Sequence, residues 1–215
     1  MTQTIRHHLS DALLTGYAAG NLNEAVSLAA AAHISLCDEC RVHLSMLEAL
    51  GGALVDSGDP FAMTDDALNT ALLRLASPKS RSAEPKSRPW VLPKPIRDYV
   101  GGDLEAVRWK AVGAGLRQAI LFSRGRSVAR LLSIPAGQAV PEHGHRGMEL
   151  TLVLQGAFDD KVDRFGRGDL EIAAEHLEHQ PVAEPGEACI CLAVTDAPLR
   201  FNALLPRLLQ PFLGI

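Results

Sequence analysis

A group of donor side chains between turn glycines constrains this chain most. His143 and His145 lie two residues apart and Glu149 follows four residues later, with Gly137 before the group and Gly156 after it. Side chains two apart on a strand point to one face, and a residue four further on returns to that face if the strand persists. Imidazole and carboxylate groups are metal donors. The pattern therefore predicts a metal site inside a small β-barrel.

A fourth ligand for this site is expected from a later strand. The candidates are His176 and His179, and their odd separation means that only one of them can face the interior of a strand. The apolar residue Leu177 lies two residues before His179 and shares its face. His179 is therefore the expected ligand.

The same spacing resembles the first cupin motif. Glycine, five residues, His-x-His, three residues, glutamate, six residues and glycine match at every fixed position between residues 137 and 156. The second motif is only partly present: residues 165–170 contain the glycine turn but lack the cupin proline, and Gln180-Pro181 follows the histidine where many cupins have an asparagine. The resemblance implies a metal-holding cupin-like barrel, and the departures argue against ordinary cupin enzyme chemistry.

A stretch rich in proline, serine and basic residues divides the chain. It covers residues 77–98 and has almost no apolar periodicity, which is typical of an extended linker. Before it, helices are expected at residues 11–20, at 23–51 with the glycine pair at 51–52 as its stop, and at 65–76 with leucines spaced as a buried stripe. After it, short β-type runs are expected at 127–134, 150–154, 169–173 and 189–194.

A second set of metal donors lies in the expected long helix. His33, Cys37 and Cys40 fall at i, i+4 and i+7, which would place one imidazole and two sulfurs on one side of the helix. This is three quarters of a tetrahedral zinc site, and a zinc ion would stabilise a helical unit of about 75 residues, a size at which one core is marginal. From spacing alone, His7, His8 and His43 all remain candidates for the fourth ligand.

Charge is unevenly distributed and limits the partners. Residues 1–76 contain 3 Lys and Arg against 9 Asp and Glu, so their net charge is −6. The net charge of the whole chain is only −4. An acidic helical unit does not suit direct binding to nucleic acid, because phosphate neutralisation needs a basic face. It suits a protein partner with a basic surface.

Composition places the chain among ordinary globular proteins. Its 215 residues are 47% hydrophobic and 21% charged, and no apolar run approaches the roughly 20 residues that a membrane span needs. The first residues lack the apolar segment of a signal peptide, so a cytoplasmic protein without membrane contact is expected. Cys189 and Cys191 would face the same way on an apolar strand and are expected to be buried thiols that do not bridge each other without strain.

The order of these parts resembles the zinc-containing anti-sigma factors of the ChrR group, which have an attached cupin-like domain. An N-terminal histidine, the His33-x-x-x-Cys37-x-x-Cys40 spacing and the barrel motif follow one another over essentially the whole chain. The resemblance is most specific at 6–14, 36–40, 141–147 and 197–202. It implies a multidomain α plus β fold: a small all-α zinc-binding helical domain at 1–76, a linker at 77–98 and an all-β cupin-like barrel at 99–215.

The resemblance also implies two zinc sites. Carried over by motif position, it assigns Zn²⁺ in the helical domain to His8, His33, Cys37 and Cys40. It assigns Zn²⁺ in the barrel to the second set: His143, His145, Glu149 and His179. Spacing alone does not choose His8 over His7, nor zinc over manganese, iron or nickel in the barrel.

The implied function is sequestration of an extracytoplasmic-function sigma factor. The helical domain would cover surfaces that the sigma factor needs for core RNA polymerase, and the barrel would sense singlet oxygen or a related oxidant. Leucines at positions 13, 14, 22, 28, 44 and 47 are candidates either for this interface or for the core. The alternative is a metal-dependent cupin enzyme, an oxygenase or isomerase, with an attached zinc module. Weak self-association through the cupin-like domain stays open.

Overall fold

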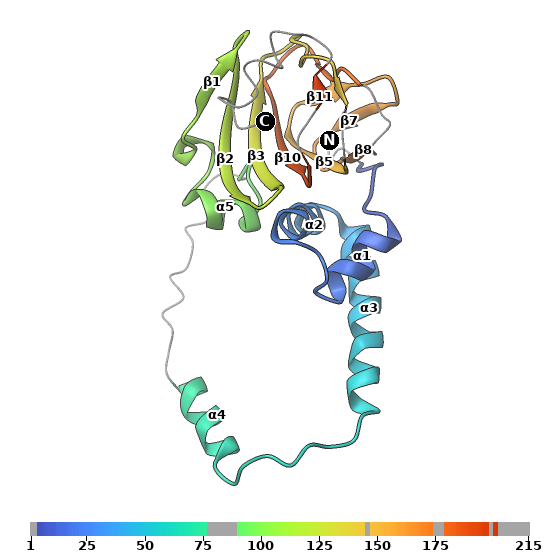
Figure 1. Ribbon diagram of the computed structural model, residues 1–215, viewed down its shortest axis with the longest axis vertical. Coiled ribbons are helices and arrows are strands. Elements are labelled where there is room, and N and C mark those ends of the chain that lie inside the picture. The colour runs from blue at the N-terminus through green and yellow to red at the C-terminus, as the bar shows by residue number, and fades with distance from the viewer. Residues whose placement is uncertain (1–3, 77–89, 145–146, 174–178, 198–199, 202–215) are drawn as a thin grey trace.

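The computed structural model describes residues 4–76, 90–144, 147–173, 179–197 and 200–201. A helical N-terminal part lies beneath a β-rich domain, and one long helix extends away from both (Figure 1). The helices are α1 (Asp11–Ala18), α2 (Glu24–Leu36), α3 (Asp38–Asp56), α4 (Ala67–Ala76), α5 (Lys94–Val100) and the short 3₁₀ helix η1 (Leu104–Ala106). In this described part of the chain, no helix is both long and apolar enough to cross a bilayer.

Two helix starts are capped by polar side chains. The Ser10 side chain accepts a hydrogen bond from the backbone N–H of Leu13 at the start of α1. Asn23 does the same for Val26 at the start of α2, at 3.0 Å. Such caps satisfy backbone donors that have no partner within the helix, and each stabilises it by about 1 kcal/mol.

The prediction of a single helix over 23–51 is wrong, because the helix is interrupted at Cys37. This residue has an extended conformation (φ −105°, ψ 111°), ends α2 and caps α3, where its sulfur accepts from the backbone N–H of Cys40. The glycine pair at 51–52 does not stop α3, which continues to Asp56. Glycine costs a helix only about 1 kcal/mol relative to alanine, and it has no side chain that would end the helix.

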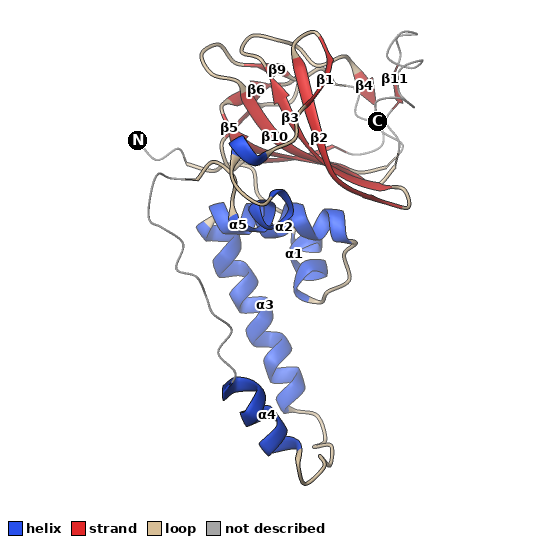
Figure 2. Cartoon of the chain, turned by 90° about the vertical axis from the view of Figure 1, so that its left-hand side faces the viewer, coloured by secondary structure: helices blue, strands red, loops and turns tan. Residues whose placement is uncertain are grey.

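The stripe of leucines predicted to be buried on the last N-terminal helix is instead exposed. Leu68, Leu72 and Leu75 of α4 all lie on the surface, together with Leu73. Figure 2 shows the reason: α4 lies near the far end of α3, away from the rest of the protein. Amphipathic spacing predicts an apolar face but not what covers it.

The β-rich part contains three sheets. The largest has six strands in the order β1-β2-β3-β10-β5-β8, and all of its strand pairs are antiparallel. A three-stranded sheet, β7-β6-β9, and a two-stranded one, β11-β4, complete the described strands. The strands are β1 (Lys110–Gly113), β2 (Leu116–Arg124), β3 (Ser127–Ile134), β4 (His143–Gly144), β5 (Glu149–Gln155), β6 (Ala157–Asp159), β7 (Arg164–Gly166), β8 (Leu170–Ala173), β9 (Val182–Ala183), β10 (Cys189–Thr195) and β11 (Arg200–Phe201). The predicted cupin-like all-β domain is confirmed as separate packed sheets and not as one closed barrel.

The two faces of the six-stranded sheet have different roles. Leu131, Leu152 and Leu192 point to one face, where they share a hydrophobic core with alanines of α2 such as Ala29. Residues of the opposite parity point toward the small sheet, where Val153 and Cys191 pack in a second core. Because side chains alternate along a strand, each strand serves both cores. The helical part and the β-rich part are therefore joined through one face of the main sheet.

The C-terminal end of the expected linker is folded. Residues 94–98 belong to α5, and Leu92 and Ile96 are completely buried. The Asp103 carboxylate accepts hydrogen bonds from the backbone N–H groups of Val91 and Leu92, at 3.0 and 2.8 Å. Residues 77–89 of that linker lie outside the described residues.

Candidate metal centres

The break between α2 and α3 brings the N-terminal donor set together. His8 Nδ1 lies 3.3 Å from Cys37 Sγ and 3.8 Å from Cys40 Sγ, and His33 Nε2 lies 3.3 Å from Cys40 Sγ. The ligand atoms of all four residues lie within 4.8 Å of one another. Ideal Zn–N and Zn–S bonds in a tetrahedron place neighbouring ligand atoms roughly 3.6 Å apart. The donor set therefore fits a zinc ion.

The hydrogen bonding of His33 prepares it as a ligand. Its Nδ1–H donates to the carbonyl oxygen of Gly168 at 2.9 Å, which leaves the lone pair of Nε2 directed at Cys40. Burial lowers the pKa of His33 to about 4, so the imidazole is neutral at physiological pH. Burial also raises the pKa of the Cys40 thiol to about 11. A thiolate at this position needs a nearby cation, which a metal ion would provide.

The turn before β8 holds the histidines of this centre in place. The buried Asp169 carboxylate accepts hydrogen bonds from the backbone N–H groups of Arg6 (2.6 Å), His7 (3.0 Å) and Gly166 (2.8 Å). The His7 carbonyl accepts from the Leu170 N–H at 3.1 Å. The backbone preceding His8 is thereby fixed by the same turn that accepts from His33. We call residues 166–170 the anchoring turn.

A second donor set lies inside the β-rich part. His143 on β4 and Glu149 on β5 are buried, and the buried His179 forms an isolated bridge with His143. His143 Nε2 lies 3.2 Å from His179 Nε2 and 3.6 Å from the Glu149 carboxylate. These three residues form a candidate metal group. The fourth expected ligand, His145, lies outside the described residues, as does the rejected candidate His176.

The proton positions in this group favour a bound cation. His143 Nδ1–H donates to the Pro141 carbonyl at 2.8 Å, because a carbonyl oxygen can only accept. His179 Nδ1 faces the carboxylates of Asp160 (2.7 Å) and Glu171 (3.2 Å). With both Nδ1 atoms protonated, the two Nε2 atoms face each other across a position that a proton or a metal ion can occupy. The residues present therefore fit a metal.

Sequence reasoning missed Asp160 and Glu171, which form a further acidic group with His179. Burial lowers the pKa of His179, but the hydrogen bond and charge of Glu171, together with Asp160, outweigh it and raise that pKa to about 9. Carboxylates behind a histidine orient its ring and strengthen it as a ligand. Glu171 pairs with Thr151 across β5 and β8, so only the strand register reveals its position.

The remaining candidates lie apart from both donor sets. His7 contacts Asp163 through Nε2 at 3.1 Å, and His43 lies partly exposed on α3, 3.9 Å from Asp11. The structure thus groups His8, and neither of these, with the N-terminal cysteines. Cys189 and Cys191 are buried thiols with sulfurs 3.4 Å apart, as predicted.

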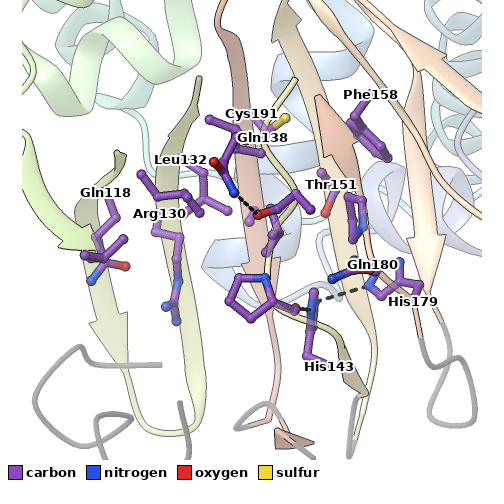
Figure 3. A pocket seen from close by; sticks show the side chains of 18 of the residues that line it. Gln118, Arg130, Leu132, Gln138, His143, Thr151, Phe158, His179, Gln180 and Cys191 are labelled. Atoms are coloured by element: carbon purple, nitrogen blue, oxygen red, sulfur yellow. Dashed lines mark hydrogen bonds between the residues drawn. The ribbon is translucent and has the colours of Figure 1, made fainter. Parts of the chain in front are cut away.

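A pocket opens beside the second donor set. It has a volume of about 500 Å³ and lies between the six-stranded sheet and the segments at 138–143 and 179–181. In Figure 3, His143 and His179 lie on one side of the pocket, while Gln118 of β2 and Arg130 of β3 lie on the other. The second donor set is therefore accessible from this pocket.

Comparisons with known proteins agree with this architecture. Residues 98–198 match the family model described as the ChrR cupin-like domain. The chain is 58% identical over 212 residues to the anti-sigma-E factor ChrR of Cereibacter sphaeroides, covering 99% of this chain and 100% of that protein. The crystal structure of Rhodobacter sphaeroides SigE in complex with the anti-sigma ChrR is similar with a TM-score of 0.76 and 56% identity, covering 89% of this chain and 99% of that one. The chain belongs to the ChrR family of anti-sigma factors.

Proposed function

We propose that this protein binds an extracytoplasmic-function sigma factor through α3 and α4 and keeps it from core RNA polymerase. The observation that carries the proposal is the exposed apolar surface of these two helices. Support for the partner comes from the similar ChrR chain, which was crystallised in complex with SigE. That relative is a regulator, so the cupin enzyme alternative has no support from it.

The apolar surface of α3 runs along one face. Val42, Met46, Leu50 and Leu54 recur every four residues, a spacing that places them on one side of the helix. Their exposed fractions are 57% to 67%. On α4 the exposed fractions of four leucines are 53% to 80%: Leu68, Leu72, Leu73 and Leu75. Soluble monomers rarely leave so many large apolar side chains uncovered, so this surface suits a protein partner.

The leucines that the sequence left open between interface and core belong to the core. Leu13, Leu14 and Leu28 are buried, and the other three pack against the same core: Leu22, Leu44 and Leu47. The proposed interface therefore consists of other residues, further along α3 and on α4. Its acidic surroundings, with a net charge of −6 over residues 1–76, favour a basic protein surface over nucleic acid.

We further infer that zinc occupies both donor sets. The N-terminal set, His8, His33, Cys37 and Cys40, has the nitrogen and sulfur donors that tetrahedral structural zinc sites use. A bound zinc ion supplies a crosslink between the N-terminal segment, α2 and α3. The second set would add His145 to its three grouped residues. A pair of zinc ions per cytoplasmic chain is the expectation, one in the helical domain at 1–76 and one in the cupin-like domain, which is preceded by α5 from residue 94.

Release of the sigma factor is the proposed role of the cupin-like domain. Singlet oxygen or a related oxidant would act there, and the change would reach the helices through contacts already present. The anchoring turn supports this route, because it bonds to His33 and to the backbone before His8 while β8 carries Glu171 toward His179. An oxidant can change the affinity for the sigma factor only if such contacts differ between the sigma-binding state and the released state.

The test is a comparison of three full-length variants. Met46→Glu and Leu50→Glu each place a carboxylate on the apolar face of α3. Each should weaken sigma binding about 30-fold or more, because hot-spot residues contribute about 2 kcal/mol or more. Val162→Glu is the matched control, since Val162 is 63% exposed on the cupin-like domain. The readouts are copurification of the sigma factor and transcription from its promoter. Full inhibition by both stripe variants would overturn the proposed interface.

A further inference from the structure

We propose that the pocket beside the second donor set binds a small organic acid, with its carboxylate on Arg130 and its apolar body against the aliphatic wall. This goes beyond sequestration of a sigma factor and does not depend on it.

Arg130 is the positive anchor. It lies on β3 with only 3% of its surface exposed, and it lines the pocket. Its Nε atom is buried and has no hydrogen-bond partner. Figure 3 shows its guanidinium on the pocket side of the sheet, next to Gln118. A buried donor without an acceptor is unfavourable by about 1–3 kcal/mol, and more for a charged group, so this position suits an anionic ligand.

The groups nearest to Arg130 leave this charge in place. On the sheet, Arg130 pairs with Ile120 of β2 and Ala193 of β10, whose side chains are apolar. Glu149 acts on Arg130 through its charge, but in the second donor set its carboxylate lies 3.6 Å from His143. If the Glu149 carboxylate ligates a cation, its negative charge is neutralised and the net charge of the described pocket lining becomes more positive. A guanidinium binds a carboxylate through two parallel N–H groups, which gives both strength and orientation.

The rest of the pocket is predominantly aliphatic. Its described lining includes Leu116, Leu132, Ile134, Val140, Phe158 and Pro181. Polar side chains such as Gln118, Gln138 and Thr151 also line it, and apolar surface combined with placed polar groups is characteristic of small-molecule sites. The rim is open, because Ala114, Pro141 and Gln180 are exposed. A volume of about 500 Å³ accommodates a compact acid of moderate size.

The experiment uses the full-length protein with its metal content as purified and octanoate as the probe. Isothermal titration should show saturable binding of octanoate, and the neutral analogue octanamide should bind about tenfold more weakly or worse, since it forms no ion pair with the guanidinium. Equal binding of the two probes, or no binding of octanoate at millimolar concentration, would overturn the proposal. This comparison needs no variant, so folding defects cannot obscure it.

Two variants locate the site. Arg130→Met keeps an unbranched apolar stem and removes the charge, and it should reduce octanoate affinity about 10- to 100-fold. The matched control is Arg126→Met, because Arg126 is exposed at the turn between β2 and β3. Ala193→Leu should also abolish binding by filling the pocket beside Arg130. Unchanged octanoate binding in both Arg130→Met and Ala193→Leu would place the probe elsewhere and reject the assignment. Neither readout involves a sigma factor, so this failure is distinguishable from failure of the proposed function.

Discussion

Asp169→Asn should loosen the N-terminal segment from the cupin-like domain. The Asp169 carboxylate accepts from three backbone N–H groups, with two bonds at one oxygen and one at the other. An asparagine amide can accept only through its oxygen, so at least one charge-assisted bond is lost. The amide NH₂ of the asparagine then faces a backbone N–H, and two donors cannot bond to each other. Hydrogen bonds to charged groups contribute about 1.5–3 kcal/mol each. We expect a loss of about 2–4 kcal/mol in the free energy of unfolding.

Thermal unfolding measures this loss directly. For a chain of this size, a loss of about 2–4 kcal/mol lowers Tm by roughly 5–15 °C. Because the anchoring turn also orients the proposed zinc ligands, chelator competition should show zinc affinity at the N-terminal donor set weakened about 10- to 100-fold. Asp163→Asn is the control: Asp163 also contacts Arg6 and His7, but its side chain is 44% exposed. Exposed pairs contribute about 1 kcal/mol or less. Equal Tm values for the two variants would refute the reasoning.

The same residue predicts a response to acid. Burial raises the pKa of Asp169, but hydrogen bonds from the backbone N–H groups of Arg6, Gly166 and His7 outweigh it, and the net pKa lies below the ordinary value. The folded-state pKa is therefore lower than the unfolded one. The carboxylate stabilises the fold above the unfolded pKa of about 3.9, and this stabilisation is lost as pH falls through the folded pKa. Asp169→Asn should remove this part of the acid dependence in denaturant titrations.

Three further changes test other parts of the structure. Gly168→Ala should destabilise the protein by about 1–3 kcal/mol more than Gly186→Ala, because both glycines have positive φ but only at Gly168 would a Cβ lie 2.5 Å from a side-chain atom of Ile5; equal melting temperatures would contradict this. Cys40→Ser should lower the zinc content by one ion per chain and release the sigma factor, which metal analysis and copurification would detect. His143→Ala should remove the other ion and blunt promoter induction under photosensitiser and light; full induction would exclude this metal from sensing.

The strands were predictable because their signals are local. The run at 127–134 is β3 without any shift, and the run at 189–194 is β10 without its last residue. Each is a short apolar segment between turn residues, and burial on both faces explains its continuous hydrophobicity. Strand parity pointed to His143, Glu149 and His179, but the structure brings them together from β4, from β5 of a different sheet and from an isolated bridge, and not from one persistent strand.

The junction at Cys37 was harder to predict, because His33 and Cys40 also fit one continuous helix. The available signal was the acidic pair Asp38 and Glu39, which occupies the first turn of α3. Acidic side chains favour a helix N-terminus through the helix dipole. A cysteine acting as the cap obscures this signal, since serine, threonine and aspartate are the usual caps.

Other features depend on contacts that no local pattern contains. The stripe on α4 shows an apolar face, but its exposure follows from the position of the helix far from any core. Asp160 and Glu171 approach His179 only through pairing of distant strands and loops. The anchoring turn joins residues more than 130 positions apart, as in the bond between His33 and Gly168.

Because the helical part and the β-rich part share a core on the six-stranded sheet, they do not need the peptide chain between them to stay associated. Ala25, Leu28 and Ala29 of α2 are buried in the core that contains sheet residues such as Leu192. A single proteolytic cut between residues 77 and 89 would leave two fragments that stay associated without a covalent bond. Conversely, a fragment of residues 1–76 made alone would present this apolar face of α2 to water. Expressed together as separate polypeptides, the two halves should reassemble in trans.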